Sequence, residues 1–398
     1  MSPNGRVLIR TLPLSDNFGG VLQAYALQEV LRQLGADAVT DVSRSDRPDG
    51  LRSWGKILIK SGVCRVPVLQ RFAPIAWHRQ LIRRDRARPI RPFVAAKIRT
   101  VRIYRGRRPR LDELSDVTLY LVGSDQVWRN AYADVRSYLF DFAPDGAKMA
   151  SYAASFGRDN LDEYPSQLVE DSRALAQRFE AISVREAEAI SLCRDHWGVD
   201  AVQHIDPTLL LTVDHYQEIS GPSADNLTRK SNVLSYMLDP TIKTGAYIDY
   251  VARVLELRRC DLLPPRPARA KSLRPDAAGV PTVHGWLRAF GDASFVVTDS
   301  FHGTVFALLN GKPFITLVNE FRGVSRLSSL LNLVGLADRL LVDASEEDID
   351  ATLSRAIDWA DVNRRLEQER ARGRDYLASL VAWSRSSHQR LDGRCAAS

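Results

Sequence analysis

The clearest structural signal in the chain is the stretch ASFVVTDSFHGTVFALLNGKPFITLVNEFRGVS, residues 293–325. Its apolar run at residues 295–297 is typical of a buried parallel strand. Small polar residues at 298–300 suit the start of a helix, and a periodic apolar segment then reaches Asn310-Gly311, a favourable helix end. A second apolar run follows Pro313 at residues 314–318. The stretch therefore predicts a strand, a turn, a helix and a second strand.

The turn inside this stretch is the first candidate for a binding site. In open α/β sheets, ligands bind at the carboxyl ends of the strands, where helix N-termini offer free N–H groups to anions. Asp299, Ser300, His302, Gly303 and Thr304 occupy that position. His302 is the best acid–base candidate among them, and a helix-capping or core histidine is the structural alternative.

The alternation of strands and helices continues on both sides of this stretch. Short apolar runs predict strands, and periodic apolar segments predict helices. The runs that predict the main strands are residues 6–12, 117–122, 148–156, 181–184 and 233–238. The segments that predict the main helices are residues 21–34, 164–179, 246–257, 283–290 and 347–383. This order predicts an α/β protein with two doubly wound domains that face a cleft.

The expected domain boundaries follow from changes in composition. Residues 1–219 form the first domain, which contains a basic insertion at about 45–111. The polar residues 220–230 form the linker. Residues 231–345 form the second domain, and a charged helical segment follows at 346–398. The length of 398 residues fits two domains.

Composition and cysteine spacing indicate a globular protein of a reducing compartment. Apolar residues make up 45% of the chain and charged residues 26%, which are ordinary values for globular proteins. No segment has the apolar length of a membrane span, and no signal peptide is evident at the N-terminus. The four cysteines lie apart without a CxxC pair, so we expect no metal site, no disulfide framework and a cytoplasmic location.

Positive charge is concentrated in residues 52–110. This segment contains 18 Lys and Arg residues and one acid, Asp85, which gives it a net charge of +17 and leaves −10 for the rest of the chain. Such asymmetry is typical of a face for phosphates or anionic lipid, and the alternative is a solvated insertion. No nucleic-acid-binding motif accompanies the charge, so we expect no nucleic acid partner. Salt-dependent binding to anionic vesicles distinguishes a membrane-contacting segment from a solvated one.

Two further strand ends in the first domain carry polar residues. Asp16, Asn17, Gly19 and Gly20 follow the first strand, and a turn that opens on two glycines brings backbone N–H groups close to an anion. The next buried strand delivers four more candidates, Ser124, Asp125, Gln126 and Trp128. The aspartates are able to take a proton or bind sugar hydroxyls, although turn and cap residues have the same chemistry. Trp128 offers an indole face for a sugar ring, and a buried packing role is the alternative.

Several stretches that include these polar residues occur in a characteristic order. They are Asp16-Asn17-Phe18-Gly19-Gly20, Leu22-Gln23-Ala24-Tyr25-Ala26-Leu27-Gln28, Gly123-Ser124-Asp125-Gln126-Val127-Trp128, Ser151-Tyr152-Ala153-Ala154-Ser155-Phe156-Gly157, Ser183-Val184-Arg185-Glu186, Asp206-Pro207-Thr208-Leu209-Leu210, Thr298-Asp299-Ser300-Phe301-His302-Gly303-Thr304 and Arg322-Gly323-Val324-Ser325-Arg326. In these stretches, spread over residues 7–340, the chain resembles the polysaccharide pyruvyl transferase family. The basic insertion and the C-terminal segment carry no matching motif.

The resemblance implies two Rossmann-like domains in a GT-B-like arrangement, with the donor site in the second domain. It implies phosphoenolpyruvate as the donor substrate, a sugar hydroxyl pair as the acceptor, and no metal or organic cofactor. It places Arg185 and His302 at the family's donor-binding and catalytic positions. One position departs from the family pattern, because Ser300 stands where arginine is often found two residues before the histidine. We expect Arg322 or Arg326 to supply the missing cation.

The implied reaction determines which side chains the site needs. Protonation of the methylene carbon of phosphoenolpyruvate leaves positive charge on its C2 atom, and two hydroxyls then add while phosphate leaves. Cations must bind the phosphate and the carboxylate, an acid must protonate the carbon, and a base must accept the hydroxyl protons. We therefore expect Arg185, His302 and Asp125 to be catalytic, with Ser325 and Arg326 among the substrate-binding residues.

The acceptor that we expect is a sugar of a polysaccharide or a lipid-linked glycan. In that case the basic segment would contact the anionic inner face of the membrane. The alternatives are a GT-B-like glycosyltransferase that uses a nucleotide sugar, and a non-catalytic glycan- or lipid-binding scaffold. Titration with each donor distinguishes them, because a ligand that binds the native state raises the melting temperature.

Overall fold

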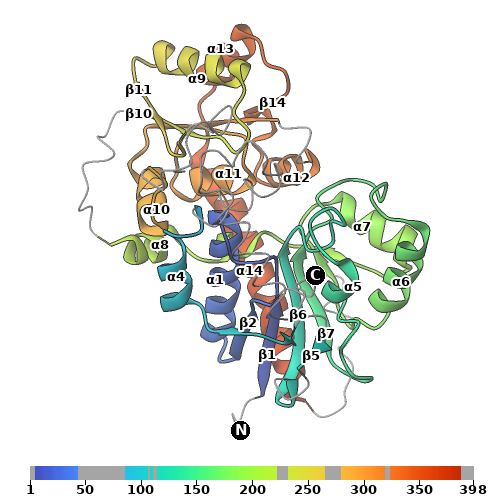
Figure 1. Cartoon of the computed structure of the whole chain (residues 1–398). Helices are drawn as coiled ribbons and strands as arrows, with labels where there is room; N and C mark the ends of the chain where they lie inside the picture. The colour runs from blue at the N-terminus through green and yellow to red at the C-terminus, as the bar shows by residue number, and fades with distance from the viewer. Residues whose placement is uncertain are drawn as a thin grey trace, which may run out of the picture.

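The computed structural model describes residues 5–43, 86–105, 108–110, 114–221, 232–264, 279–318 and 323–386. Two β-sheets form the centres of two lobes, and the C-terminal lobe lies above the N-terminal lobe in Figure 1. The N-terminal lobe holds a seven-stranded sheet and the C-terminal lobe a five-stranded sheet. All pairings between neighbouring strands in these two sheets are parallel.

The seven-stranded sheet has the order β3-β2-β1-β6-β7-β8-β9. Its strands are β1 (Arg6–Arg10), β2 (Asp37–Asp41), β3 (Thr100–Val101), β6 (Val117–Asp125), β7 (Met149–Ala154), β8 (Ser183–Val184) and β9 (Val202–Gln203). The helices of this lobe are α1 (Phe18–Gln33), α4 (Arg91–Lys97), α5 (Val135–Tyr138), α6 (Ser166–Ala176), α7 (Glu188–Leu192), the π-helical turn η3 (Cys193–Trp197), the 3₁₀ turn η4 (Pro207–Leu210) and α8 (Val213–Ser220). A separate antiparallel pair is formed by β4 (Tyr104–Arg105) and β5 (Arg108–Pro109).

The five-stranded sheet has the order β11-β10-β12-β13-β14. Its strands are β10 (Asn232–Tyr236), β11 (Arg258–Asp261), β12 (Phe295–Thr298), β13 (Phe314–Leu317) and β14 (Leu340–Leu341). Its helices are α9 (Ile242–Val254), α10 (Val283–Asp292), α11 (Phe301–Leu309), α12 (Ser325–Leu333), the 3₁₀ turn η6 (Ala337–Arg339) and α13 (Glu346–Ser354). The predicted strand, turn, helix and strand at residues 293–325 are thus confirmed as β12, α11 and β13.

Each sheet is buried on both faces. Alternate residues of one strand point to opposite faces of the sheet, and residues of both sets belong to apolar clusters. In β1, Val7 and Ile9 belong to one apolar cluster and Leu8 belongs to another. In β12, Val296 belongs to the first of these clusters, whereas its two neighbours belong to a third. Buried faces on both sides are typical of parallel sheets, and they explain why these strands are continuous apolar runs.

The strand order reverses at one place in each sheet, and such a reversal leaves a crevice for ligands at the carboxyl ends of the strands. The reversal lies between β1 and β6 in the N-terminal lobe, and between β10 and β12 in the C-terminal lobe. His302 follows β12, and Gly19, in the first turn of the helix that follows β1, lies directly against its imidazole ring. The two reversal points therefore face each other, and the chain has two Rossmann-like domains in the GT-B-like arrangement that we expected.

Aromatic side chains pack across the boundary between the lobes. The rings of Phe18 in α1 and Trp286 in α10 are stacked, with their centres 5.7 Å apart. Tyr216 of α8 meets Phe306 of α11 edge to face at 5.0 Å. Helices of both lobes thus contribute to one continuous apolar cluster. This packing holds the strand ends of the two sheets in a fixed relation.

The C-terminal helical segment differs from the continuous helix predicted at residues 347–383. It forms two helices, α13 and the long α14 (Trp359–Arg385), separated by residues 355–358. Figure 1 shows α14 returning to the N-terminal lobe. There the hydroxyl of Tyr376 donates a hydrogen bond of 3.0 Å to the carbonyl of Ser151 in β7. Because many residues of α14 are charged, its sequence did not reveal the stripe of buried residues on this helix, which includes Tyr376, Leu377 and Leu380.

A buried histidine beneath α14 predicts a measurable pH dependence of stability. His204 packs against the rings of Tyr152 and Tyr376, and burial lowers its pKa from 6.5 to about 4, with a smaller contribution from the charge of Arg372. As the pH falls from 6.5 to 4, the unfolded chain takes up this proton before the folded chain does. We therefore expect the free energy of unfolding to decrease across that window, by as much as about 3 kcal/mol from this group.

Denaturant unfolding at a series of pH values measures this effect. His204→Gln should flatten the pH dependence between pH 6.5 and 4. An identical decline in wild type and His204→Gln would contradict the assignment.

Within the described ranges, no helix combines the length and the apolarity needed to cross a bilayer. The basic segment lies largely outside those ranges, which omit residues 44–85.

Candidate active site

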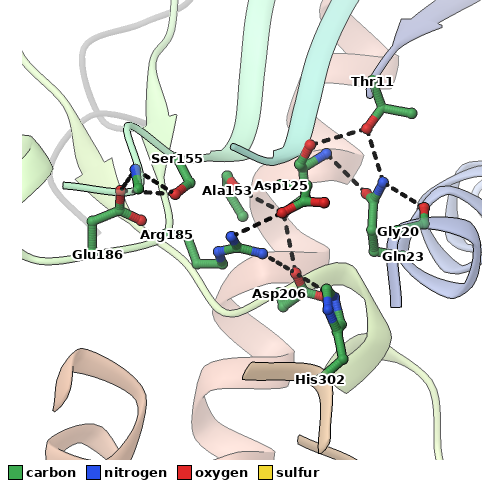
Figure 2. Close-up of polar contacts among 12 residues, drawn as sticks. Thr11, Gly20, Gln23, Asp125, Ala153, Ser155, Arg185, Glu186, Asp206 and His302 are labelled. Atoms are coloured by element: carbon green, nitrogen blue, oxygen red, sulfur yellow. Dashed lines mark hydrogen bonds and ion pairs between the residues drawn. The ribbon is translucent and has the colours of Figure 1, made fainter. Parts of the chain in front are cut away.

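Four ionisable side chains converge where the strand ends of the two lobes meet. Arg185 follows β8, Asp125 ends β6 and Asp206 precedes η4, all in the N-terminal lobe. His302 comes from the first turn of α11 in the C-terminal lobe. Figure 2 shows the side chains of Arg185 and His302 both directed at Asp206. The predicted pair of His302 and Arg185 therefore lies in one site.

Asp206 is the link between the two lobes. Its Oδ2 atom accepts a hydrogen bond of 2.8 Å from Nη1 of Arg185 and lies 3.7 Å from Nε2 of His302. Its Oδ1 atom accepts from the backbone N–H and the hydroxyl of Thr208, at 3.0 and 2.6 Å. Burial disfavours the carboxylate, but the charges of His302 and Arg185 and the bond from Thr208 outweigh it and hold the pKa of Asp206 below its usual range. Asp206 is therefore an anion at neutral pH.

Sequence reasoning did not single out Asp206 as a site residue. The residue stands inside one of the family-like stretches, and Pro207 after it reads as a turn signal. It is the N-cap of η4, a structural role that agrees with the turn signal of Pro207. The second role arises only from the tertiary fold, which brings Arg185 and His302 to its other oxygen.

Arg185 is held between two carboxylates. Its Nη2 atom lies 3.3 Å from Oδ1 of Asp125, and its Nη1 atom binds Asp206. Only 2% of the side chain is exposed. Burial by itself would lower the pKa of Arg185, but the two aspartates together with Glu186 raise it. The Nε atom makes no hydrogen bond within the described residues, so a donor remains for a ligand.

A second arginine lies beside Arg185 on the same aromatic ring. The guanidinium carbons of Arg185 and Arg326 lie 4.4 and 5.9 Å from the centre of the Phe301 ring. Burial and the charge of Arg185 lower the pKa of Arg326 to about 10, against the opposite effect of Asp125 and Glu186. Two buried guanidinium groups held this close repel each other. An anion between them would relieve that repulsion.

Glu186 fixes a turn that touches both lobes. Its Oε1 atom accepts hydrogen bonds from the hydroxyl of Ser155 (2.9 Å) and from the N–H groups of Phe156 (2.8 Å) and Gly157 (3.1 Å). Burial raises the pKa of Glu186 although cations lie nearby. The carbonyl of Gly157 lies so close to Gly323 that a side chain at 323 would overlap it. The turn held by Glu186 thus positions the loop that leads to α12.

The start of α1 differs from its prediction. The helix begins at Phe18, three residues earlier than expected, so Gly19 and Gly20 lie in its first turn rather than in a preceding loop. Phe18 is buried by its stacking on Trp286, which fixes the helix start. Gly19 is required for close approach, because a Cβ atom there would overlap the imidazole ring of His302.

Gly19→Ala therefore tests the position of His302. We expect the added methyl group to displace the imidazole and reduce turnover on the order of a hundredfold, because small displacements at a reacting centre have effects of that size. The free energy of unfolding should change by much less than the activation free energy of turnover. Gly291→Ala, at a helical glycine whose Cβ would meet only ordinary contacts, is the control and should remain active. An unchanged kcat in Gly19→Ala would refute the close approach.

A buried polar network supports Asp125 from the side of α1. Gln23 donates from Nε2 to the hydroxyl of Thr11 at 2.8 Å and accepts from the N–H of Ser124 at 3.1 Å. The hydroxyl of Ser124 contacts Oδ2 of Asp206 at 3.2 Å. Asp125 itself has a φ of 72°, in the left-handed region that few residues other than glycine adopt and that aspartate enters more readily than most. Gln23 was not predicted as a supporting residue.

Trp128 does not line the site, contrary to its predicted stacking on a sugar. Its side chain is fully buried, and its ring lies 5.3 Å from that of Phe156 and 5.0 Å from that of Trp197. No indole face is available to a ligand. Gln126 is buried beside Gly157, and its Nε2 atom has no hydrogen-bond partner in the part of the chain that the structure covers.

The polar residues around the start of α11 mainly hold the local structure. Asp299 accepts hydrogen bonds from two backbone N–H groups of the loop after β10, at 2.6 and 2.9 Å. Ser300 is the N-cap, and its hydroxyl accepts a hydrogen bond of 3.3 Å from the N–H of Gly303. Thr304 joins α11 to β13 through the hydroxyl of Thr316 at 2.8 Å. The imidazole of His302 is thus carried on a well-supported turn.

The remaining predicted residues lie at the edges of the site or beyond the described ranges. Asp16 accepts a hydrogen bond of 2.8 Å from the hydroxyl of Ser15, and Asn17 is exposed. Ser325 begins α12, and its buried hydroxyl has no hydrogen-bond partner among the described residues. Arg322 falls outside those residues. In the same part of the chain, no group of three His, Cys, Asp or Glu side chains is placed to hold a metal ion.

Comparisons with known proteins identify the family of the chain. A sequence model of the family described as polysaccharide pyruvyl transferase matches residues 17–320. No curated protein sequence matches the chain. The solved structures that resemble it include UDP-GlcNAc 2-epimerase from Neisseria meningitidis bound to UDP-GlcNAc, with a TM-score of 0.49 and 10% identity over 95% of this chain and 99% of that one.

A second such structure is the UDP-GlcNAc 2-epimerase of Methanocaldococcus jannaschii in complex with UDP-GlcNAc and UDP. Its TM-score is 0.45, with 9% identity over 91% of this chain and 98% of that one. Likenesses at this level say nothing of substrate. The family match, in contrast, runs from the start of α1 past β13 and includes Asp125, Arg185, Asp206 and His302. The chain therefore belongs to the polysaccharide pyruvyl transferase family.

Proposed function

We propose that this protein transfers a pyruvyl group from phosphoenolpyruvate to two hydroxyls of a sugar and so forms a pyruvate ketal. The observation that carries the proposal is the meeting of Arg185 and His302, from different lobes, at the single oxygen Oδ2 of Asp206. A cation for an anionic donor and an acid–base group thus lie side by side where the reversal points of the two sheets face each other.

The cationic side of the site suits a small ligand with two anionic groups. Phosphoenolpyruvate carries a phosphate and a carboxylate, and arginine binds either group through two parallel hydrogen bonds. Arg185 and Arg326 lie on the same ring of Phe301, so both are available to one compact dianion or trianion. Asp125 and Asp206 neutralise part of this charge in the free protein. A bound donor would compete with them for Arg185.

His302 is placed to act as the acid. Its Nε2 atom is buried, has no hydrogen-bond partner in the described part of the chain and lies 3.7 Å from the carboxylate of Asp206. In the proposed step, the Nε2 proton moves to the methylene carbon of the donor, which becomes the methyl group. Positive charge then develops at C2, and the donor oxygens and the two aspartates stabilise it.

The acceptor hydroxyls complete the reaction. The first hydroxyl adds to C2 and gives its proton to Asp125, the closest carboxylate to Arg185 besides Asp206. The bond between C2 and the phosphate oxygen then breaks, and phosphate leaves with the bonding electrons. The second hydroxyl adds to C2 and loses its proton to the departing phosphate. Donor and diol are thereby converted to ketal and phosphate, with the last proton returned from Asp125 to His302. The acceptor that we propose is a sugar of a polysaccharide or lipid-linked glycan.

Titration with candidate donors tests this proposal. Phosphoenolpyruvate should raise the melting temperature of the wild-type protein, and the shift should disappear in Arg326→Gln. UDP-GlcNAc is the comparison ligand, because a GT-B-like glycosyltransferase would bind a nucleotide sugar. A shift with UDP-GlcNAc and none with phosphoenolpyruvate would replace the proposal by glycosyl transfer. No shift with either compound would favour a non-catalytic scaffold.

A further inference from the structure

Tyr132 is an exposed aromatic residue close to the site. Its exposed fraction is 47%, and it belongs to the loop that follows β6, four residues beyond the buried Trp128. The other large apolar side chains with comparable exposure among the described residues are aliphatic and belong to the C-terminal lobe, namely Ile242, Val254 and Val342. Single exposed apolar residues are common on protein surfaces, so the interest of Tyr132 lies in its position rather than in its exposure alone.

The loop that carries Tyr132 is held rigidly. The backbone N–H of Tyr132 donates to the carbonyl of Arg129 at 2.9 Å. Arg129, only 5% exposed, binds Glu163 through Nη2 at 3.0 Å, and Glu163 also accepts from the N–H of Ala131 at 3.2 Å. Asn130 adds a hydrogen bond of 2.6 Å to the carbonyl of Glu163. The ring is therefore presented on a fixed support, and little conformational entropy would be lost on binding.

A cation covers part of the Tyr132 ring. The guanidinium carbon of Arg129 lies 4.4 Å from the centre of the Tyr132 ring, in a cation–π arrangement. Nearly half of the residue is nevertheless exposed. A tyrosine ring suits the apolar side of a sugar ring, and its phenol hydroxyl suits a sugar hydroxyl.

Tyr132 also lies on the donor side of the site. Glu163, which anchors the loop, also binds Nε of Arg158 at 2.8 Å, and Arg158 directly follows the Gly157 turn that touches the C-terminal lobe at Gly323. The loop of Tyr132 and the loop of Arg326 thus lie against the same turn.

We propose that Tyr132 is the platform on which a pyranose ring of the acceptor stacks, with its diol directed toward Asp125 and His302. The assignment of the stacked pyranose as the acceptor rests on the proposed function. The stacking of a sugar on Tyr132 does not. It also replaces the role that sequence reasoning gave to Trp128, which the fold buries. The ligand class is a neutral hexopyranoside, recognised by its apolar face.

Saturation-transfer NMR with methyl β-D-galactopyranoside and methyl β-D-glucopyranoside, recorded without any donor, tests the platform. At least one glycoside should receive saturation from the wild-type protein, and Tyr132→Phe should retain the signal. Tyr132→Ala should weaken binding about tenfold, the size expected for loss of one aromatic contact. Tyr250→Ala is a matched control, because Tyr250 also carries an arginine over its ring, at 5.0 Å, but belongs to α9.

The outcomes separate this inference from the donor assignment. If the phosphoenolpyruvate shift persists in Tyr132→Ala while glycoside binding falls, both proposals are supported. Glycoside binding that is absent in the wild type, or equal in wild type and Tyr132→Ala, would overturn the platform and leave the donor assignment intact. Glycoside binding that depends on Tyr132 in a protein that does not bind phosphoenolpyruvate would overturn the donor alone.

Discussion

His302→Asn is expected to lower kcat by about two to four orders of magnitude while the protein remains folded. The range is the contribution that a positioned general acid–base group makes to a reaction. Asparagine keeps a polar side chain of similar size at the first turn of α11 but has no proton to give to the methylene carbon. The Nε2 atom of His302 makes no hydrogen bond within the described residues, so its removal leaves no donor or acceptor stranded there.

Phosphate release from phosphoenolpyruvate in the presence of acceptor measures the loss. The binding of phosphoenolpyruvate should weaken far less than kcat falls, since Arg185 and Arg326 remain. His196→Asn, at a histidine in η3 away from the lobe boundary, is the control and should have wild-type kinetics. Turnover of His302→Asn close to that of the wild type would exclude His302 as the acid.

Asp206→Asn is expected to have the second-largest effect, on both stability and activity. Both oxygens of Asp206 accept hydrogen bonds, from Thr208 on one side and from Arg185 on the other. The asparagine amide must present its NH₂ group, a donor, to one of these two donors. The substitution also removes the negative charge that compensates the buried guanidinium of Arg185. We expect the free energy of unfolding to fall by about 3 kcal/mol, because a buried charge that loses its partner is strongly destabilising. Asp125 remains beside Arg185 and limits the loss.

The activity of Asp206→Asn should fall as well, because Arg185 and His302 lose their shared anchor. Chemical denaturation and kcat, measured on the same preparation, report the two effects separately. Asp171→Asn is the control, since Asp171 pairs with Arg136 at 2.6 Å on the surface, where ion pairs contribute little. A variant as stable and active as the wild type would show that Asp206 does not join the lobes.

The fold was predictable from the sequence wherever burial follows the local pattern. The strands of residues 293–325 are buried on both faces, so their apolar runs and the polar turn between them stand out clearly. The start of α1 was misplaced because Gly19-Gly20 normally indicates a turn, whereas stacking of Phe18 on Trp286 extends the helix through both glycines. The partner that decides this start lies far away in the sequence.

The site was predictable only in part, for a related reason. His302 and Arg185 stand at strand ends, which is a local property. The function of Asp206 depends on contacts with residues 21 and 96 positions away, and η4 gives it a sufficient local explanation. Trp128 was predicted at the wrong depth, because a tryptophan after a strand looks the same in sequence whether its ring faces solvent or the ring of Trp197.

A crystal structure of the protein soaked with phosphoenolpyruvate tests the central claim most directly. We predict density for the donor at the lobe boundary, with its phosphate and carboxylate against the guanidinium groups of Arg185 and Arg326 and its methylene carbon next to Nε2 of His302. Density for the donor at another place, or none at concentrations that shift the melting temperature, would contradict pyruvyl transfer at this site.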